Sequence, residues 1–279
     1  MAETLTITLA QLNQSVGDLA GNAAAMLAAR ERAKAAGADL VVFPEMQLVG
    51  YPAEDLVLKP AFVARATQEL ETMAKSTADG ATAMLVGSIF VVDGALHNGV
   101  ALLDGGKVSA IRLKHELPNY GTFDEVRLFQ PGPLPEPIVF KGVMIGLPIC
   151  EDVWHPDVCR HLADFGAELL ICVNGSPYEI DKDTLRIDGV AKRRAVDTGL
   201  PLAYLNRVGG QDELVFDGAS WPSWPITPRT STARWCWRCV TMSIATGFRA
   251  SCWACRAGST ARSARRLQPM PWGRTGSTA

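Results

Sequence analysis

The stretch GVMIGLPICEDVWHP, residues 142–156, contains an apolar strand with a reactive side chain at its end. No charged residue lies between Gly142 and Cys150, which is typical of a strand that is covered on both faces. The residues EDVWHP that follow favour the start of a helix. Cys150 is therefore predicted to lie on a turn from a buried strand into a helix, the repeating pattern of an α/β fold.

The same pattern recurs along the chain up to about residue 220. Further strand-like apolar runs are TITLAQL, DLVVFPE, AMLVGSIF, GVALLD, VSAIRLK, ELLICVN and PLAYLNR. The spacing of alanine, leucine and charged residues predicts helices over 22–36, 61–74, 156–165 and 183–198. Because strands and helices alternate, we expect an α/β fold in which reactive residues follow the carboxyl ends of strands.

The composition of the 279 residues, 48% hydrophobic and 20% charged, is that of a globular protein. No apolar run approaches the roughly 20 residues of a membrane span, and no secretion signal is evident after Met1. The sequence therefore predicts a cytoplasmic protein without a membrane partner. Seven cysteines, an odd number, favour reduced thiols over a disulfide framework.

The last part of the chain, residues 221–279, differs from the rest. It holds nine Arg and no Lys, Asp or Glu, so residues 1–220 carry the other 18 of the 27 basic residues and all 29 acidic ones. Six of the seven Trp and four of the seven Cys also lie in this tail, without apolar periodicity. The sequence is thus divided into an organised domain, residues 1–220, and a tail that is not typical of a domain.

Three residues at strand ends are candidates for chemistry. Glu45 follows DLVVFP, a position that suits a general base, although a solvated or capping glutamate is the commoner case. Lys114 ends VSAIRLK, where its charge suits an oxyanion, although a single lysine is usually a surface residue. Cys150 suits a nucleophile, and Glu151 and Asp152 beside it argue against the purely apolar pocket of a structural cysteine. No ligand-spaced histidine cluster or phosphate-binding glycine loop accompanies them.

The motifs around these residues resemble the nitrilase, or carbon-nitrogen hydrolase, superfamily. FPEMQLVGYP contains Glu45, KHELPNYGTFDE begins with Lys114 and GLPICEDVWHP contains Cys150, in the order of that family's Glu-Lys-Cys triad. Together with NGSPY and FDGAS, these motifs are similar to the glutaminase domain of glutamine-dependent NAD synthetases. The resemblance covers roughly residues 4–220 and implies a four-layer αββα sandwich.

The resemblance also implies a role for each residue of the triad. Cys150 would be the nucleophile, Glu45 the general base and Lys114 the oxyanion stabiliser. Attack on a glutamine carboxamide would give a γ-glutamyl thioester and ammonia, and this step would need no metal or cofactor.

Further family properties concern the substrate and the second half of those enzymes. Tyr120, Ser176 and Lys182 stand where the family contacts L-glutamine, although an arginine also occurs in the family at the position of Lys182. In the family, a synthetase domain uses ATP and Mg²⁺ to convert deamido-NAD to NAD with the ammonia. Its members are homo-oligomers, so the resemblance implies an oligomer here as well.

A change of reading frame would explain the tail. When its codons are shifted by one base, codons compatible with Arg238 and the residues after it spell SGGIDS, the phosphate-binding signature of those synthetases. We hypothesise that a frameshift near Ser220 and Trp221 replaced the synthetase domain. Residues 221–279 are then expected to be disordered or poorly packed, and the sandwich to lack its last strands and expose edges prone to aggregation.

Two other interpretations stay open from the residues alone. A stand-alone amidase or nitrilase of the same superfamily would keep the triad without a synthetase domain. The tail could instead form a module of another class. Its nine arginines would bind nucleic acid, or its two Cys-x-x-Cys pairs would bind zinc. The four cysteines of these pairs are Cys236, Cys239, Cys252 and Cys255. The resemblance disfavours this module and implies neither a metal nor a nucleic-acid partner.

Overall fold

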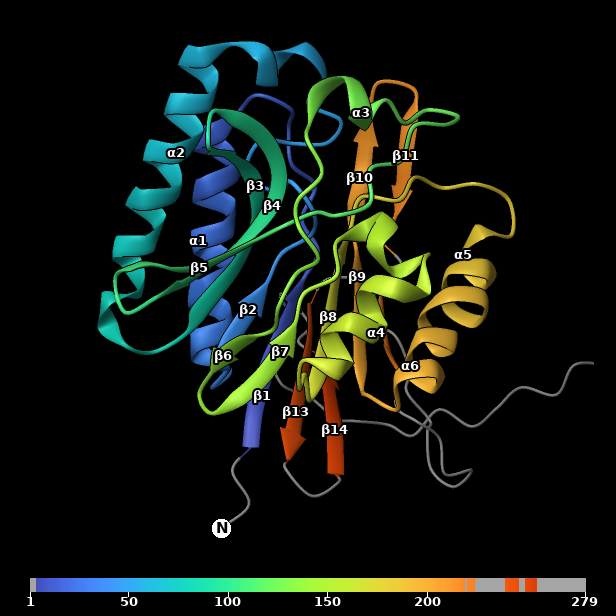
Figure 1. The fold of residues 1–279 in the computed structure, drawn as a ribbon. Coiled ribbons are helices and arrows are strands. Elements are labelled where there is room, and N and C mark those ends of the chain that lie inside the picture. Colours follow the sequence, from blue (N-terminus) through green and yellow to red (C-terminus); the bar gives the residue numbers. More distant parts are fainter. Residues whose placement is uncertain (1–3, 219, 224–238, 246–248, 255–279) are drawn as a thin grey trace, which may run out of the picture.

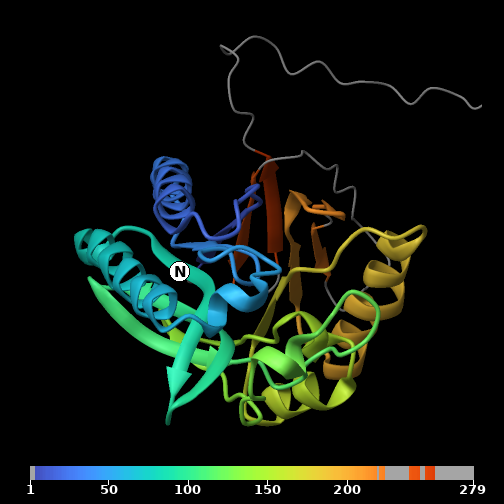
Figure 2. The ribbon, with the colours of Figure 1, turned by 90° about the horizontal axis from the view of Figure 1, so that it is seen from above.

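Two β-sheets pack face to face, and helices cover the outer face of each (Figures 1 and 2). This computed structural model describes residues 4–218, 220–223, 239–245 and 249–254. Helices α1 (Leu19–Ala35) and α2 (Pro60–Lys75) lie on the first sheet, and α4 (Pro156–Asp164) and α6 (Lys192–Thr198) lie on the second. The αββα sandwich that the resemblance implied is therefore confirmed.

The first sheet supplies Glu45 and Lys114. Its strands are β1 (Thr4–Ala10), β2 (Leu40–Val42), β3 (Ala83–Val92), β4 (Ala95–Asp104), β5 (Lys107–Leu113), β13 (Cys239–Ala245) and β14 (Arg249–Ala254). They are ordered β14-β13-β1-β2-β3-β4-β5. Strands β1, β2 and β3 are parallel, whereas β4 and β5 continue the sheet antiparallel. Glu45 lies just beyond β2, and Lys114 lies just beyond β5.

The second sheet supplies Cys150. Its strands are β6 (Ile138–Phe140), β7 (Val143–Gly146), β8 (Leu169–Asn174), β9 (Leu202–Asn206) and β12 (Ser220–Ser223), in the order β12-β9-β8-β7-β6. A separate hairpin joins β10 (Val208–Gln211) to β11 (Leu214–Asp217). Short helical segments are η1 (Glu54–Leu58), η2 (Ser76–Asp79), α3 (Glu125–Leu128), η3 (Cys150–Val153), α5 (Lys182–Thr184) and the π-helical η4 (Leu185–Ala191).

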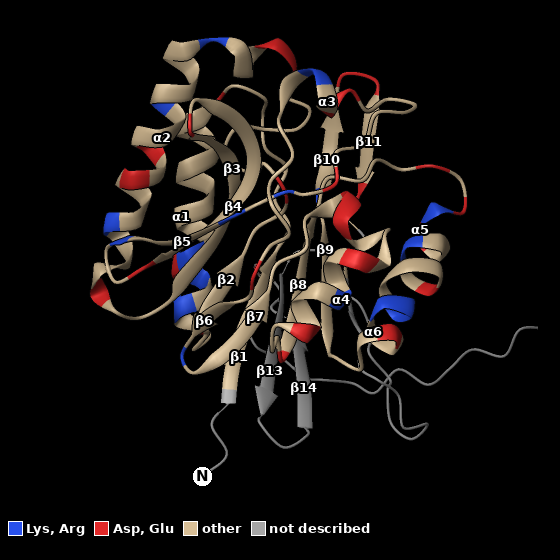
Figure 3. Ribbon diagram, in the orientation of Figure 1, with Lys and Arg blue, Asp and Glu red and all other residues tan. Residues whose placement is uncertain are grey.

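Charged residues of both signs are mixed on the outer helices and loops (Figure 3). In the described part of the chain, no helix is long and apolar enough to cross a membrane. Within the same residues, no group of three or more His, Cys, Asp or Glu is placed to hold a metal ion. The outer layers thus present their polar faces to water and direct their apolar faces at the sheets.

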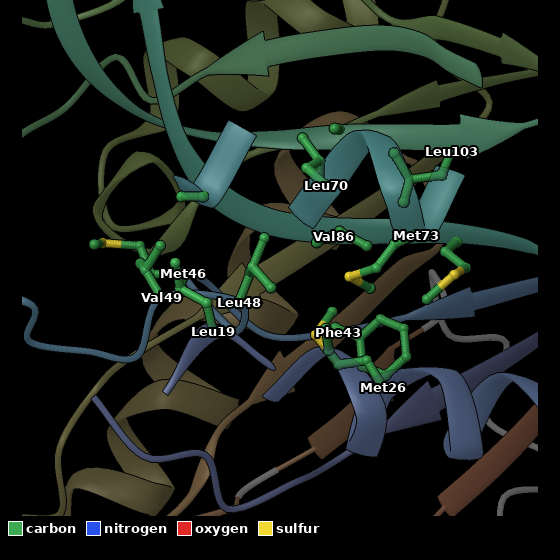
Figure 4. Close-up of a cluster of buried hydrophobic side chains, with 14 of the residues drawn as sticks. Leu19, Met26, Phe43, Met46, Leu48, Val49, Leu70, Met73, Val86 and Leu103 are labelled. Atoms are coloured by element: carbon green, nitrogen blue, oxygen red, sulfur yellow. The ribbon is translucent and has the colours of Figure 1, made fainter. Parts of the chain in front are cut away.

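Three groups of buried apolar side chains fill the spaces between the four layers. The group between the first sheet and its helices includes Met26, Phe43 and Leu70 (Figure 4). Strand β8 contributes to the other two, because Ile171 faces the opposite sheet whereas Cys172 faces α4 and α6. Burial of both faces of β8 explains why residues 169–173, LLICV, are apolar without interruption.

The predicted helices agree with the structure to within a few residues at their ends. The last of them, predicted over 183–198, is divided into α5, η4 and α6. The sequence missed β6, β10 and β11. Strand β6 has only 3 residues and follows several prolines, and the hairpin strands contain glycine and charged residues. None of these segments has an apolar run of ordinary strand length.

The tail differs from the expectation of bare sheet edges. Strand β12 pairs antiparallel with β9, and β13 pairs antiparallel with β1. An edge strand offers unpaired N–H and C=O groups to any extended segment, and CVTMSIA in β13 alternates apolar and polar residues. Of the four tail cysteines, Cys236 and Cys255 lie outside the described residues, and for Cys239 and Cys252 only the backbone is described.

The inter-sheet core makes a prediction about stability. Ile171 is 0% exposed between the sheets, so we expect Ile171→Ala to lower the free energy of unfolding by about 2–5 kcal/mol. Val139, which is 65% exposed on β6, is the control, and Val139→Ala is expected to change it by less than about 0.5 kcal/mol. Urea denaturation measures both, and equal effects would contradict the four-layer packing.

Candidate active site

Glu45 is fixed through both carboxylate oxygens. Its Oε1 accepts hydrogen bonds from Lys114 Nζ at 2.7 Å and from Asn98 Nδ2 at 2.8 Å. Its Oε2 accepts one from the Gly175 backbone N–H at 2.8 Å, across the interface between the two sheets. The side chain is 1% exposed, so this glutamate is neither solvated nor a surface cap.

Lys114 places its ammonium group between two carboxylates. Its backbone N–H donates to Asn98 O at 2.9 Å, which fixes the residue beside the end of β4. Its Nζ donates to Glu45 Oε1 at 2.7 Å and to both oxygens of Glu125 at 2.8 Å. Burial lowers the pKa of Lys114, but the charges of Glu125 and Glu45 outweigh it and raise that pKa well above its ordinary value. Lys114 is therefore a permanent cation of the site.

Glu125 is a residue of the site that sequence reasoning missed. It begins α3 and accepts a further hydrogen bond from Tyr51 Oη at 2.9 Å. Burial raises its pKa, while Lys114 acts in the opposite direction. Its position at the end of KHELPNYGTFDE was the available signal, since that motif already contained Lys114.

Cys150 lies on the predicted turn between strand and helix. It is the first residue of η3, is 2% exposed and has a left-handed backbone with φ of 46°. Burial raises its pKa well above the ordinary value, and the charge of Glu45 adds to this, while Lys114 and the Gly175 N–H act to lower it. The thiol is therefore protonated at neutral pH, with a carboxylate and an ammonium near it.

Two of the three residues proposed to contact the substrate lie together near a ring. Tyr120 is 56% exposed, donates to Glu151 Oε2 at 2.8 Å and packs edge-on against Phe123, with ring centroids 5.5 Å apart. Lys182 places its Nζ 5.8 Å from the centroid of the Phe123 ring, and also pairs with Glu179 at 2.5 Å. Phe123 was not singled out from the sequence, and Glu151 was noted only as an acidic neighbour of Cys150; both stand within the quoted motifs.

Ser176, the third of these residues, is buried next to Gly175 rather than beside that ring. Its N–H donates to Asn206 Oδ1 at 2.9 Å, and its hydroxyl accepts from Arg186 Nε at 3.1 Å. Arg186 in turn forms a bidentate ion pair with Asp217, at 2.8 and 2.7 Å. These contacts hold the loop that delivers the Gly175 N–H to Glu45, which gives NGSPY and FDGAS a structural role.

Arg207 adds a second buried cation near the site. Its guanidinium stacks over the Phe216 ring at 4.4 Å and over the Tyr51 ring at 5.8 Å, and Nη1 donates to Tyr51 O at 2.7 Å. Burial lowers the pKa of Arg207 to about 10, so it stays protonated at neutral pH. Arg207 thus contacts the carbonyl and the ring of Tyr51, whose hydroxyl donates to Glu125.

Comparison with known proteins agrees with this geometry. The sequence profile described as carbon-nitrogen hydrolase matches residues 6–221. The chain belongs to the carbon-nitrogen hydrolase family. Members of this family are enzymes, and the buried Glu45, Lys114 and Cys150 lie in the matched part of the chain.

Within the carbon-nitrogen hydrolases, the chain is similar to the N-terminal region of glutamine-dependent NAD⁺ synthetases. It is 49% identical over 220 residues to that of Rhodobacter capsulatus, which covers 79% of this chain and 40% of the relative. The synthetase of Aquifex aeolicus is 41% identical over 217 residues, or 77% of this chain and 38% of the relative. The chain thus spans about 40% of the length of the curated relatives it matches.

Solved structures show the same relationship. A glutamine-dependent NAD⁺ synthetase from Acinetobacter baumannii superposes with a TM-score of 0.75 at 34% identity, covering 80% of this chain and 42% of the other. A mutant amidase from Nesterenkonia sp. AN1, with acrylamide added to its active site cysteine, gives a TM-score of 0.69 at 28% identity. That match covers 79% of this chain and 85% of the amidase.

Gly87 makes a prediction about the position of Glu45. A Cβ at Gly87 on β3 would lie 2.5 Å from both Pro44 O and Met46 N, the backbone that carries Glu45. We expect Gly87→Ala to displace this turn, to lower the free energy of unfolding by about 1–3 kcal/mol and to reduce amide hydrolysis. Urea denaturation and an amidase assay measure these effects.

Gly210→Ala is the matched control for Gly87→Ala. A Cβ at Gly210 would meet only Leu214 O, at an ordinary 3.8 Å, so stability and hydrolysis should both be retained. Full activity of Gly87→Ala would show that the turn carrying Glu45 tolerates displacement.

Proposed function

We propose that this chain hydrolyses the carboxamide of L-glutamine and releases ammonia. The observation that carries the proposal is the buried group of Glu45, Lys114 and Cys150, with a salt bridge of 2.7 Å between Lys114 and Glu45. Hydrolysis of an amide through a thioester requires a nucleophile, a proton acceptor and a positive charge for the oxyanion. These three residues supply one function each.

In the proposed first step, Cys150 Sγ attacks the carboxamide carbon while Glu45 accepts the thiol proton. The raised pKa of Cys150 requires a base that acts during the attack, because little thiolate is present beforehand. Lys114 stabilises the tetrahedral oxyanion. Two of its contacts go to the same carboxylate, Glu125, so one N–H can turn to the oxyanion while the ion pair persists.

Collapse of the tetrahedral intermediate then breaks the carbon-nitrogen bond. Glu45 passes the proton to the leaving nitrogen, ammonia departs and the γ-glutamyl group stays on Cys150 as a thioester. A water molecule that loses a proton to Glu45 attacks the thioester carbonyl, and glutamate leaves as the proton returns to the sulfur. The balance is one glutamine and one water to glutamate and ammonia, without a cofactor.

Two charges near the Phe123 ring support an amino acid as substrate. Lys182 offers a cation to an α-carboxylate, and Glu151, bound by Tyr120, offers an anion to an α-ammonium group. Ser176 lies on the Gly175 loop, where it is proposed to contact the part of glutamine nearest the reacting carbon. The relatives are glutamine-dependent NAD⁺ synthetases, which agrees with this substrate.

The wider role that we propose is the supply of ammonia for the ATP-dependent amidation of deamido-NAD to NAD. The relatives that carry this name are longer, and the chain spans about 40% of them. ATP, Mg²⁺ and deamido-NAD would therefore be substrates and cofactors of the synthetase half, in a cytoplasmic homo-oligomer. The proposed frameshift near Ser220 and Trp221 would separate this half from residues 1–220.

A second candidate is an amidase that acts without a synthetase domain. The observation that favours it is the superposition on the Nesterenkonia amidase, which covers 85% of that protein. The two candidates differ in substrate, because a simple aliphatic amide has no α-carboxylate or α-ammonium group for Lys182 and Glu151.

The nucleophile is tested with Cys150→Ala. Because the thioester cannot form without the Cys150 sulfur, we expect ammonia release from glutamine to fall by roughly 10⁴-fold or more. Cys159→Ala, which removes a buried thiol of α4 on the far side of the second sheet, should keep most of the activity. Ammonia is measured with glutamine and with propionamide.

Equal ammonia release by the wild type and Cys150→Ala would refute the catalytic assignment. Cys150-dependent release from propionamide but not from glutamine would instead favour the amidase.

Lys182 is tested through the KM for glutamine. A charge-assisted hydrogen bond is worth about 1.5–3 kcal/mol, so Lys182→Gln is expected to raise KM by about 10-fold or more with a smaller change in kcat. Lys34→Gln is the control. Lys34 lies on the outer helix α1 and forms a salt bridge of 2.8 Å with Asp79. A fall in kcat at constant KM would contradict a role in binding the α-carboxylate.

A further inference from the structure

Asp152 is a buried carboxylate that the proposed reaction does not use. It is 0% exposed and lies two residues after Cys150 in η3. Its Oδ1 accepts hydrogen bonds from the backbone N–H groups of His115 at 3.1 Å and Glu116 at 2.7 Å. Its Oδ2 accepts one from the N–H of Ile149 at 2.9 Å. One side chain thus binds three backbone amides on two segments.

The three amides flank the reactive residues. His115 and Glu116 directly follow Lys114, which comes from the first sheet, and Ile149 directly precedes Cys150, which follows β7 of the second sheet. The Asp152 carboxylate therefore connects the backbone of the cation to the backbone of the nucleophile. The Gly175 N–H on Glu45 is a further tie between the two sheets at this point.

The backbone at Cys150 needs such a support. With φ of 46°, Cys150 adopts a left-handed conformation that is strained for a residue with a Cβ and persists only where its surroundings impose it. The Asp152 N–H also donates to Ile149 O at 3.1 Å. Both polar backbone groups of Ile149 are thus bound by Asp152, which closes a ring around Cys150.

We propose that Asp152 is a positioning residue, whose carboxylate sets the distance between the Lys114 ammonium and the Cys150 sulfur and holds Cys150 in its left-handed conformation. The inference deepens the proposed function and rests on it only for turnover, because reaction of Cys150 with an alkylating reagent reports the same geometry.

Ionisation of Asp152 links this arrangement to pH. Burial raises the pKa of Asp152 to about 7, although its N–H donors and Lys114 act to lower it. Protonation turns one acceptor oxygen into a donor, which opposes an N–H group. The thiolate fraction of Cys150 already falls with the pH because its pKa is raised, so protonation of Asp152 should make the fall in Cys150 reactivity steeper below about pH 7.

Other ionisable groups face Asp152 from the surrounding elements. They are Lys114 at the end of β5, Cys159 on α4 and Cys172 on β8. Burial raises the pKa of Cys159 to about 12 and that of Cys172 well above its ordinary value, so both stay neutral over this pH range. The backbone N–H of His115 donates to Asp152, so the imidazole ring belongs to a residue that contacts this carboxylate. The variant His115→Gln controls for titration of that ring.

The test is the rate at which iodoacetamide alkylates Cys150, followed from pH 5 to 9 by peptide mass spectrometry. In Asp152→Asn, an amide nitrogen must face one of the three N–H donors, and in Asp152→Ser the side chain is too short to reach both segments. Glu168→Gln is the control, because Glu168 Oε2 also accepts a backbone N–H, from Met144 at 2.9 Å, far from the site.

We expect both Asp152 variants to alkylate about 100-fold more slowly at Cys150, the loss typical of a reacting group misplaced by about 1 Å, and to lack the steeper fall in rate below about pH 7. Cys159 and Cys172 should stay unlabelled, with kcat reduced and KM for glutamine little changed. His115→Gln and Glu168→Gln should keep the rate and the pH profile of the wild type.

An unchanged Cys150 rate in either Asp152 variant would overturn the proposal. Faster labelling of Cys150, Cys159 and Cys172 together would overturn it too, since it would indicate loosened packing only. If the wild type alkylates at Cys150 but does not hydrolyse glutamine, the proposed function fails while the alkylation rates still decide the role of Asp152.

Discussion

The site depends on one buried ammonium group. Lys114 is 0% exposed, and its three N–H donors are directed at Glu45 and Glu125. Removing one partner of a buried ion pair costs about 3–5 kcal/mol, because the remaining charge is left without water or a counter-charge. The chain can therefore bury Lys114 only when the turn after β2, the end of β5 and the start of α3 are all in place. Folding of these segments and assembly of the catalytic charges are the same event.

The net charge of Lys114, Glu45 and Glu125 then affects the ionisation of the Cys150 thiol. Lys114 with two carboxylates carries a net negative charge, which together with burial opposes a second anion at Cys150 and raises the pKa of its thiol. A preformed thiolate is thus disfavoured, and in the proposed reaction the thiol proton passes to Glu45 as Cys150 attacks the substrate. Arg207, held against Tyr51, adds a second buried cation, and its charge interacts with that of Glu45. It reduces the negative field of the glutamates without pairing with either of them.

Sequence reasoning found the residues that follow regular strands. Glu45, Lys114 and Cys150 each follow an apolar run, and the turn at a strand end brings such residues to one edge of a sheet. Glu125 begins a helix of 4 residues after an irregular loop, where no periodicity marks it. The contacts of Asp152 and Arg186 reach over 36 and 31 positions to Glu116 and Asp217, and such pairings depend on tertiary packing that one sequence does not encode locally. The strand pairing of the tail was missed for a similar reason, because backbone hydrogen bonds need little from the side chains.

The two sheets meet at the active site, so their packing is part of the catalytic geometry. Glu45 and Lys114 belong to the first sheet, whereas Cys150, the Gly175 N–H and Asp152 belong to the second. A shift of one sheet against the other would lengthen the contacts of Glu45 and Asp152 together. The edges of the sheets matter for this reason: β12 borders β9, whose end supplies Asn206 to the Ser176 loop, and β13 borders β1. A strand that completes an edge fixes the neighbouring strand whatever its own sequence. It would thereby support the loop on which the proposed catalytic geometry depends.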